Sequence, residues 1–473
     1  MSTVRFFRHS SRLFRYYVPT EFVLLAVIEF FVLMLSLYLA LEVRFYGHDS
    51  TTPFVNYLLR AFLYAAVMQL SMVAFGLFQR QHGRFFDVLI LRIGSSLLLG
   101  LIPLGILFYL IPNLFLGRGV LALTVFFSYV FISIIRLYFS KAVKQHNLWA
   151  RVLVLGSGEK AKLIKDAEKA GELEGLNIIG YVSLSGDKAP WHDEKTIALD
   201  KRLMKYSQEK YIDEIVLAMD DRRTSQIPPD DLLDCKMSGI DIVDMATFFE
   251  RRTGKIRLDT LSPSWLYLSD GFYESTFRNL IKRLFDIVIT LLVLPLALPL
   301  ALLVTTAIFL ESRGRGPIFY SQTRIKQFGK PFQIYKFRSM VSDAEKDGVA
   351  RWASKNDARI TRIGSILRKG RLDELPQLFN ILKGDMSFVG PRPERPEFIA
   401  RLSEKIPYYG ERHRVKPGLT GWAQISCAYA DTEGGSLEKL QYDLYYVKNH
   451  SIFLDLLILL QTLEVVLLSK GAQ

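Results

Sequence analysis

Four apolar stretches in the first third of the chain constrain its fold more than any other feature. They cover residues 22–41, 57–78, 88–110 and 120–139. Each is close to the ~20 residues that an α-helix needs to cross the hydrocarbon layer of a bilayer. Half of the residues are hydrophobic and the mean hydropathy is positive, a combination that a soluble protein of this length rarely shows. We therefore predict a membrane protein whose first domain, residues 1–145, is a four-helix transmembrane bundle.

The positions of Lys and Arg predict the orientation of this bundle. Basic residues cluster before the first stretch, between the second and third, and after the fourth, as at Arg8, Arg84 and Lys141. Since cytoplasmic loops carry the excess of Lys and Arg, both ends of the bundle are expected in the cytoplasm. Glu29 lies within the first stretch. We expect it to hydrogen-bond inside the bundle rather than to relay protons.

The part of the chain after the bundle alternates strands and helices. Strands are predicted near residues 151–155, 178–182, 214–219 and 241–243, and a helix near 229–238. Alternation of this kind indicates a parallel α/β sheet. Residues 146–270 are therefore predicted to form a Rossmann-like domain.

A glycine-rich turn follows the first of these strands. Gly156, Gly158 and Ala161 have the form of a dinucleotide fingerprint. The fingerprint also expects an acid at the end of the second strand, but the next acid is Asp187, after an intervening Ser-Leu-Ser. Whether this domain binds a nucleotide stays open, and the lysine-rich segment 160–169 is interpreted as a solvated helix face.

A fifth apolar stretch, residues 280–310, differs from the first four. Pro295 and Pro299 lie in its middle, where each removes a backbone donor and kinks a helix. Both of its flanks are basic, which suits a re-entrant helix that returns to the same face of the membrane. A simple fifth span is the alternative, and it would place everything after Ser312 outside the cell. Residues 451–469 are interpreted as an amphipathic helix on the membrane or packed on the domain.

Two adjacent carboxylates, Asp373 and Glu374, follow a basic segment. Helix capping is one interpretation, with Asp373 as N-cap, Pro376 in the first turn and Gly384 near the end. Capping does not explain two acids preceded by Arg and Lys. An ionised Asp at a helix N-terminus is a competent nucleophile toward phosphorus, and a neighbouring Glu suits Mg²⁺.

Four sequence blocks around these acids resemble those of the bacterial sugar transferases, the polyprenyl-phosphate hexose-1-phosphate transferases. The blocks are Tyr-Lys-Phe-Arg-Ser-Met at 335–340, Leu-Asp-Glu-Leu-Pro-Gln-Leu at 372–378, the Val-Gly-Pro-Arg-Pro end of 385–393 and the Pro-Gly-Leu-Thr-Gly-Trp core of 415–425. The resemblance extends from about residue 280 to the C-terminus. It implies a mainly α (α+β) catalytic domain, residues 271–473, with the re-entrant helix at 280–310.

The resemblance implies a reaction and its residues. Asp373 would attack the sugar-bearing phosphorus of a UDP-sugar, release UMP and hold the phosphosugar until polyprenyl (undecaprenyl) phosphate accepts it. Glu374 would be the Mg²⁺ ligand. Residues implied in substrate binding are Lys336, Arg338, Arg368, Arg371, Pro391, Arg392 and Pro393. Many members carry Ser where this chain has Arg371, so the role of that residue stays open, as does the sugar.

The resemblance also implies a place in the cell: the bacterial inner (cytoplasmic) membrane, with the catalytic domain in the cytoplasm, at the first membrane step of exopolysaccharide, capsule or O-antigen assembly. The expected partners are the UDP-sugar, polyprenyl phosphate and the lipid bilayer, and the large N-terminal part is compatible with a homodimer. The net charge of +13 suits anionic lipids and phosphates. No nucleic-acid module is recognised, so nucleic acid is not expected. Cys235 and Cys427 are interpreted as reduced thiols.

Two other functions stay open. A membrane-bound nucleotide-sugar dehydratase or epimerase would need a second glycine-rich NAD site and a catalytic Tyr-x-x-x-Lys. Tyr206 and Lys210 have that spacing, but they precede the strand at 214–219 and follow no second fingerprint. A non-enzymatic scaffold with a degenerate transferase domain is the other alternative, and the intact Asp373–Glu374 pair argues against it.

Overall fold

The structure is a computed structural model. It describes residues 10–13, 16–46, 54–78, 86–144, 149–173, 175–184, 187, 191, 194–199, 202–221, 229–261, 265, 269, 271–272, 275–341, 357, 359–427 and 433–467. The chain divides into two compact units, Met1–Leu261 and Ser262–Gln473. The first unit contains long apolar helices and a parallel sheet, and the second contains all four sequence blocks.

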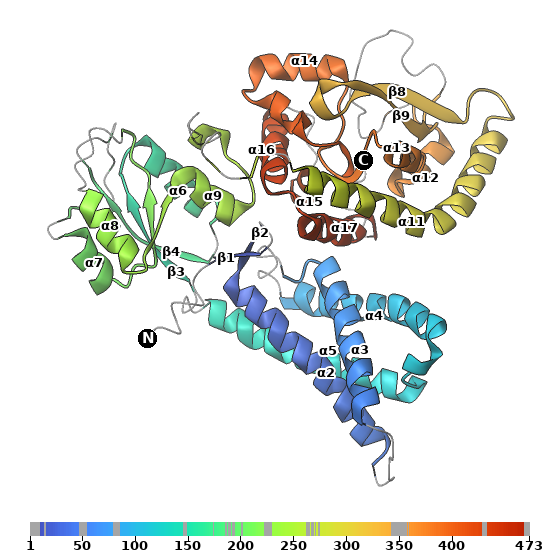
Figure 1. The fold of residues 1–473 in the computed structure, drawn as a ribbon, viewed down its shortest axis with the longest axis horizontal. Helices are drawn as coiled ribbons and strands as arrows, with labels where there is room; N and C mark the ends of the chain where they lie inside the picture. The colour runs from blue at the N-terminus through green and yellow to red at the C-terminus, as the bar shows by residue number, and fades with distance from the viewer. Residues whose placement is uncertain are drawn as a thin grey trace. The chain divides into compact units, whose positions relative to one another are not determined.

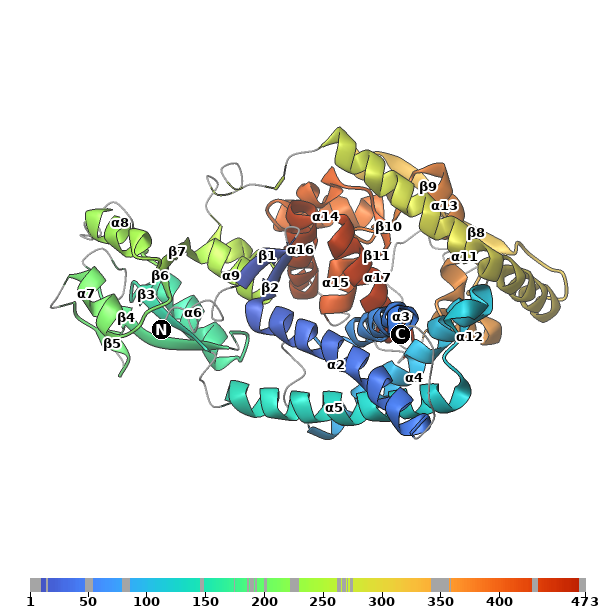
Figure 2. The ribbon, with the colours of Figure 1, turned by 60° about the horizontal axis from the view of Figure 1, so that its bottom comes forward.

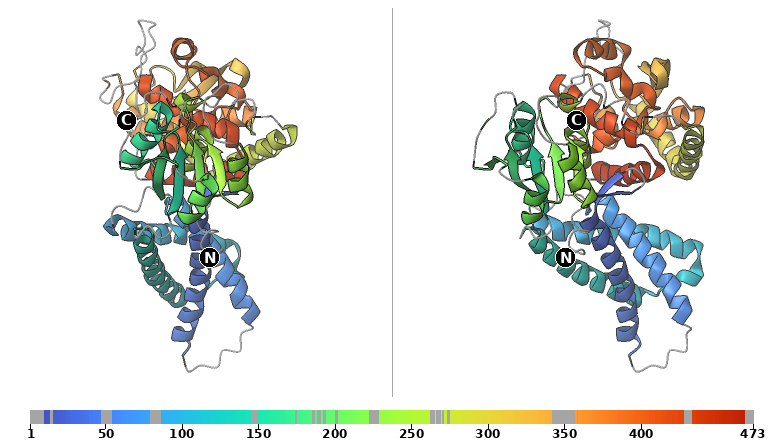
Figure 3. Two further views of the ribbon diagram at one scale, coloured as in Figure 1. Left: turned by 90° about the vertical axis from the view of Figure 1, so that its left-hand side faces the viewer. Right: turned by 60° about the vertical axis from the view of Figure 1, so that its left-hand side comes forward.

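Four long helices form where the four apolar stretches lie. A hairpin of β1 (Ser10–Leu13) and β2 (Tyr16–Pro19) leads into α2 (Thr20–Arg44), α3 (Phe54–Ala74), α4 (Phe86–Leu110) and α5 (Arg118–Lys144), with a short turn, η2 (Pro112–Leu114), before the last. Consecutive helices pack on each other, and α2 also packs on α5 (Figure 3). Their shared core includes Leu33, Tyr64, Ile93 and Ile132.

A buried ion pair joins α2 to α5. Arg136 Nη2 donates to Glu29 Oε2 at 2.9 Å, and Glu29 is 0% exposed. Arg136 also donates to the carbonyl of Leu77 at the end of the α3 region. The prediction that Glu29 hydrogen-bonds among these helices is confirmed, and the pairing removes the large cost of an isolated charge in an apolar environment.

Five helices in the described parts of the chain are long and apolar enough to cross a membrane, by length and composition. They are α2 to α5 and α11 (Thr276–Glu311). Large side chains on their outer faces are exposed, such as Leu91 and Leu292. Apolar surface of this extent marks a membrane protein.

The first unit also contains a five-stranded parallel sheet in the order β5-β4-β3-β6-β7. Its strands are β3 (Ala150–Leu155), β4 (Leu176–Val182), β5 (Thr196–Ile197), β6 (Glu214–Leu217) and β7 (Asp241–Asp244). The four predicted strands are confirmed. The two-residue β5 is too short to leave a hydrophobic pattern in the sequence.

Helices cover both faces of this sheet (Figure 1). One face packs on α6 (Glu159–Lys169) and α9 (Met245–Thr253), and the other on α7 (Leu203–Glu209) and α8 (Pro229–Met237). A short turn, η3 (Leu258–Thr260), follows α9. The central strand β3 is buried on both faces, which explains its continuous run of apolar residues.

Helix α11 begins the second unit as one 36-residue helix with Pro295 and Pro299 inside it. Figure 1 shows the helix bending strongly within its length. Each proline lacks the N–H that would bond to the preceding turn, which is the usual cause of such a bend.

The rest of the second unit follows α11 as short elements. They are β8 (Phe319–Ile325), η4 (Gln327–Gly329), β9 (Pro331–Phe337), α12 (Arg362–Lys369), η5 (Leu372–Glu374), α13 (Gln377–Lys383), β10 (Ser387–Val389), α14 (Pro396–Lys405), η6 (Tyr409–Arg414), β11 (Gly418–Thr420), α15 (Trp422–Ser426), α16 (Glu433–Asn449) and α17 (Ile452–Leu467). Strands β8 and β9 form an antiparallel hairpin, and β10 pairs with β11 in parallel.

Helix α17 is the apolar helix expected near the C-terminus. It packs on α15, β10 and β11 (Figure 2). Leu454 and Ile458 are fully buried, and Thr462 shares a hydrogen bond with Thr420 at 2.8 Å. The structure therefore shows this helix packed on the domain, which is one of the two placements predicted for it.

Candidate active site

The acid pair lies on η5, a single 3₁₀ turn between α12 and α13. Asp373 does not cap the next helix, which was the alternative interpretation of this residue, because the N-cap position of α13 is Pro376. Arg371, in the left-handed conformation (φ 56°), starts the turn and places the acids before the helix rather than at its cap. Gly384 ends α13 with φ 92°, as predicted.

Three cations surround one oxygen of Glu374. Its Oε1 lies 2.9 Å from Arg392 Nη2, 3.1 Å from Lys336 Nζ and 3.8 Å from Arg371 Nη1. Glu374 itself is buried. The fold thus brings together residues from β9, η5 and the Pro-Arg-Pro block, separated by up to 56 positions between Lys336 and Arg392.

These contacts set the ionisation of the pair. Burial would raise the pKa of Glu374, but Lys336, Arg392 and Arg371 overcome it and hold that pKa well below its usual range. Burial raises the pKa of Asp373; Lys336 opposes this shift and the charge of Glu374 adds to it. The pair therefore has one carboxylate that is firmly ionised and one that takes up a proton more readily than an ordinary aspartate.

An asparagine that sequence reasoning missed aligns the two sides of this site. Asn380 on α13 is fully buried. Its Nδ2 donates to the Gln333 carbonyl at 2.7 Å, and its Oδ1 accepts from the Tyr335 N–H at 3.1 Å. These bonds fix β9 against α13, and Lys336 is the next residue on β9. No motif signalled this role, since an Asn inside a short helix has many ordinary explanations.

Two of the other predicted site residues differ in their surroundings. Arg368, in the last turn of α12, opposes the rise in the pKa of Asp373 that burial causes. Its Nη1 is buried and makes no hydrogen bond within the described residues, which suits a group that awaits an anion. Arg338 instead donates to the carbonyl of Arg315 at 3.2 Å, and within the described residues it is not among the cations paired with Glu374.

The Pro-Arg-Pro block is held by the Pro-Gly-Leu-Thr-Gly block. Gly418 N–H donates to the Pro391 carbonyl at 3.0 Å. The two chains approach so closely that a Cβ on Gly418 would lie 2.1 Å from the nitrogen of Gly390, so only glycine fits there. The carbonyl of Pro393 accepts from Arg324 Nη1 at 3.3 Å. Of this block, Arg392 is the residue whose side chain reaches Glu374.

The N-terminal part of α11 is joined to the same region. Asp286 accepts from Ser387 Oγ at 2.8 Å and from the Phe388 N–H at 3.1 Å. Lys282 pairs with Asp455 at 2.7 Å, and Arg283 donates to the carbonyls that end α13. Buried polar contacts therefore fix the long apolar helix to β10, α13 and α17.

The glycine-rich turn of the α/β domain is closed by the chain's own carboxylates. Ser157 N–H donates to Asp187 Oδ2 at 2.7 Å. The N–H groups of Glu159 and Lys160, at the start of α6, donate to Asp220 at 3.0 and 2.9 Å. Gly156 is required here, since its φ is 131° and a Cβ would lie 2.5 Å from the Ala218 carbonyl. The backbone N–H groups of residues 157, 159 and 160, which a pyrophosphate at this turn would use, are thus already bonded.

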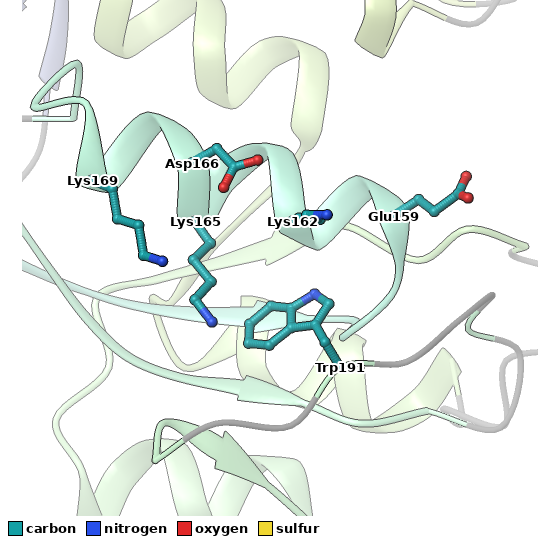
Figure 4. A pocket seen from close by; sticks show the side chains of 6 residues that line it. All are labelled: Glu159, Lys162, Lys165, Asp166, Lys169 and Trp191. Carbon is teal, nitrogen blue, oxygen red and sulfur yellow. The ribbon is translucent and has the colours of Figure 1, made fainter.

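A hollow of about 300 Å³ lies along α6, lined by Glu159, Lys162, Lys165, Asp166, Lys169 and Trp191. In Figure 4, Lys165 and Lys169 extend toward the side of Trp191, while Asp166 points away from it. Lys165 Nζ lies 3.9 Å from the centre of the Trp191 ring, a cation–π contact. Lys162 and Lys169 are exposed, as the interpretation of segment 160–169 as a solvated helix face requires.

Comparisons with known proteins identify the family of the chain. Residues 277–469 match the family described as "Bacterial sugar transferase". A UDP-glucose:undecaprenyl-phosphate glucose-1-phosphate transferase of Caulobacter vibrioides is 42% identical over 196 residues, which are 41% of this chain and 72% of that protein. The chain belongs to the bacterial sugar transferase family, as its four sequence blocks predicted.

Two longer relatives match more of the chain. A UDP-N-acetylgalactosamine-undecaprenyl-phosphate N-acetylgalactosaminephosphotransferase of Aeromonas hydrophila is 39% identical over 50% of this chain and 55% of its own. A UDP-glucose:undecaprenyl-phosphate glucose-1-phosphate transferase of Klebsiella pneumoniae is 37% identical over 57% and 58%. The chain thus spans little more than half the length of these two relatives.

Proposed function

We propose that this protein transfers a sugar-1-phosphate from a UDP-sugar to undecaprenyl phosphate and releases UMP. The observation that carries the proposal is the buried acid pair, with Lys336, Arg371 and Arg392 around Glu374. The names of the relatives describe this class of reaction with two different sugars, so the sugar of this protein is left to experiment.

Asp373 is the proposed nucleophile. An oxygen of its carboxylate attacks the sugar-bearing phosphorus, a new P–O bond forms, and the bond to the bridging oxygen breaks so that UMP leaves. A phosphate oxygen of the carrier then attacks the same phosphorus. The carboxylate of Asp373 departs unchanged, and the product is the diphosphate-linked lipid sugar.

The cations around Glu374 are suited to the diphosphate of the donor. Arg392 and Arg371 present guanidinium groups, which bind phosphate oxygens in a forked geometry. Arg368 adds its unbonded Nη1. When the donor enters, these groups exchange part of their contact with Glu374 for contact with phosphate, and they neutralise the charge that develops on UMP.

The donor set also fits Mg²⁺. Among the described residues, no three His, Cys, Asp or Glu side chains come close enough to form a complete metal cage. Mg²⁺ is typically held by one or two carboxylates together with substrate phosphates, and Glu374 with Asp373 supplies such a pair. Glu374 would hold the ion, which when bound neutralises charge on the diphosphate.

We further propose that the second unit lies on the cytoplasmic face of the bacterial inner membrane, with α11 entering the bilayer and returning. The bend of α11 in Figure 1 and its two prolines support this placement. UDP-sugars are cytosolic and the carrier phosphate lies at the membrane interface, so the acid pair would stand where the two substrates meet.

A UMP-release assay across a panel of UDP-sugars, with undecaprenyl phosphate and Mg²⁺, tests the proposal. We expect release with one sugar, none from Asp373→Asn, and full release from the control Glu397→Gln, which changes an exposed carboxylate on α14. Mass spectrometry should find a phosphosugar on Asp373 in wild-type protein given donor alone. A nicotinamide-dependent change without UMP would favour the dehydratase alternative, and normal turnover by Asp373→Asn would refute the mechanism.

A further inference from the structure

The segment 391–394 is held through its carbonyl groups. The carbonyls of Pro391, Arg392, Pro393 and Glu394 accept, in that order, from Gly418 N–H (3.0 Å), Arg412 Nη2 (3.0 Å), Arg324 Nη1 (3.3 Å) and Ile325 N–H (3.2 Å). Two of these four residues are prolines without an N–H. Donors from β8, η6 and β11 therefore fix four successive peptide groups of the segment that carries Arg392.

Arg412 is the more deeply buried of the two charged side chains among these donors, at 6% exposed against 20% for Arg324. Besides the Arg392 carbonyl, it donates from Nη1 to Tyr409 Oη at 2.7 Å. Its Nη2 also lies 2.7 Å from Asp443 Oδ2 on α16. Asp443 is 2% exposed. A buried guanidinium needs such a counter-charge, since a lone buried charge is very costly.

Stability alone explains this pair poorly. A buried ion pair is often no more stabilising than apolar residues of the same size. What apolar residues would not reproduce is the bond to the carbonyl of Arg392, whose own Nη2 lies 2.9 Å from Glu374 Oε1. The chain of contacts runs from Asp443 through Arg412 and the Arg392 backbone to the acid pair.

We propose that Arg412, held by Asp443, is a positioning residue for Arg392. It fixes the peptide from which the Arg392 side chain extends, and so directs that guanidinium to the place where the donor diphosphate binds. This inference rests on the proposed function in one respect, namely that Arg392 contacts the donor. A displacement of about 1 Å in such a group can lower the rate by up to 10²-fold.

A double-mutant cycle on the full-length protein tests this inference. Arg412→Lys keeps the charge but has one nitrogen, on a shorter side chain, in place of the two that contact Tyr409 (Nη1) and the Arg392 carbonyl and Asp443 (Nη2). We expect it to lower kcat/KM for the UDP-sugar by roughly tenfold or more. In an Arg392→Ala background the same change should have little further effect, because residues that act in one chain are not additive. Arg414→Lys is the matched control, since Arg414 lies on the same η6 turn with an exposed side chain paired to Glu411.

Two outcomes of the cycle would overturn the proposal: additive losses in the double variant, which indicate a general structural effect, or an Arg392→Ala protein as active as wild type. Where Arg412→Lys does not fold, Asp443→Asn enters the cycle in its place with the same expectations. Hydrogen exchange of the peptide that contains Arg392 and Glu394 needs no turnover. It should quicken in Arg412→Lys and not in Arg414→Lys, and equal exchange would also overturn the proposal. If the wild-type protein releases no UMP from any donor, while exchange still differs between Arg412→Lys and Arg414→Lys, only the proposed function is contradicted.

Discussion

Neutralising each acid of the pair should change the stability of the second unit in opposite directions. Glu374 has a depressed pKa, so its charge contributes stability above the pKa of the unfolded chain, and this contribution is lost only as pH falls through the depressed value. Asp373 has a raised pKa. The stability that its protonated form contributes is present below the pKa of Asp373 in the unfolded chain, and it is lost as pH rises through the pKa of Asp373 in the folded protein. At pH 7 the charge of Asp373 therefore opposes folding.

The magnitude for Glu374→Gln follows from the three cations around Oε1. At an effective dielectric constant of about 20, two unit charges roughly 3 Å apart attract by about 5 kcal/mol before desolvation is counted. Removing one partner of a buried pair costs about 3–5 kcal/mol. Because the side chains of Lys336, Arg371 and Arg392 are 21%, 38% and 33% exposed, we take the lower end, about 3 kcal/mol. For a unit of roughly 200 residues this lowers the unfolding temperature by about 6–12 °C.

The assay is limited proteolysis of the full chain in detergent at rising temperature, with loss of the C-terminal unit followed by an antibody to a C-terminal tag. Glu374→Gln should lose its protection at lower temperature than wild type, and Asp373→Asn at the same or a higher temperature. Glu397→Gln, which removes an exposed carboxylate of the same unit, should shift the transition by less than about 2 °C. Equal shifts for Asp373→Asn and Glu374→Gln would refute the assignment of different environments to the two acids.

Three further results are expected. The rate of UMP release should fall as pH drops through a value above the ordinary aspartate pKa of about 3.9. The reason is that burial raises the pKa of Asp373 and that only its ionised form attacks. A pH–rate profile whose acidic side falls at the ordinary aspartate pKa would contradict this. Glu29→Gln should destabilise the first unit by about 3 kcal/mol, since it leaves Arg136 buried without its counter-charge, whereas exposed Glu42→Gln should not; thermal unfolding of full-length protein measures both. Asp220→Ala should destabilise the α/β domain by about 1 kcal/mol, because the N–H groups at the start of α6 lose their acceptor. The wild-type protein should show no binding of NAD in calorimetry.

The sequence predicted well what depends on periodicity. Each long apolar stretch gave a helix, and the run before Gly156 gave the central strand of a parallel sheet, because burial on both faces leaves a continuous apolar pattern. Two prolines did not divide α11 into separate helices, since a helix tolerates a missing bond when the rest of the turn is intact.

The sequence predicted which residues form the site better than it predicted how they are arranged. The four blocks named the acid pair and most of its cations. The expectation that the acids stand at a helix N-terminus missed the separate 3₁₀ turn that carries them, because an arginine in the left-handed conformation at 371 leaves no signal in the sequence. Asn380, Arg412 and Asp443 went unrecognised. Their roles arise from contacts between residues far apart in the chain, which spacing along one element does not reveal.

The four anchored carbonyls of segment 391–394 have a consequence for engineering. An attempt to change donor preference by grafting this segment from a relative would keep all four bonds, because every residue has a backbone carbonyl and the donors at 324, 325, 412 and 418 stay in the recipient chain. The grafted loop would then keep its backbone path, and any change in preference would come from the new side chains. Exchange of these four residues alone is therefore a swap that varies the presented groups and leaves the scaffold in place.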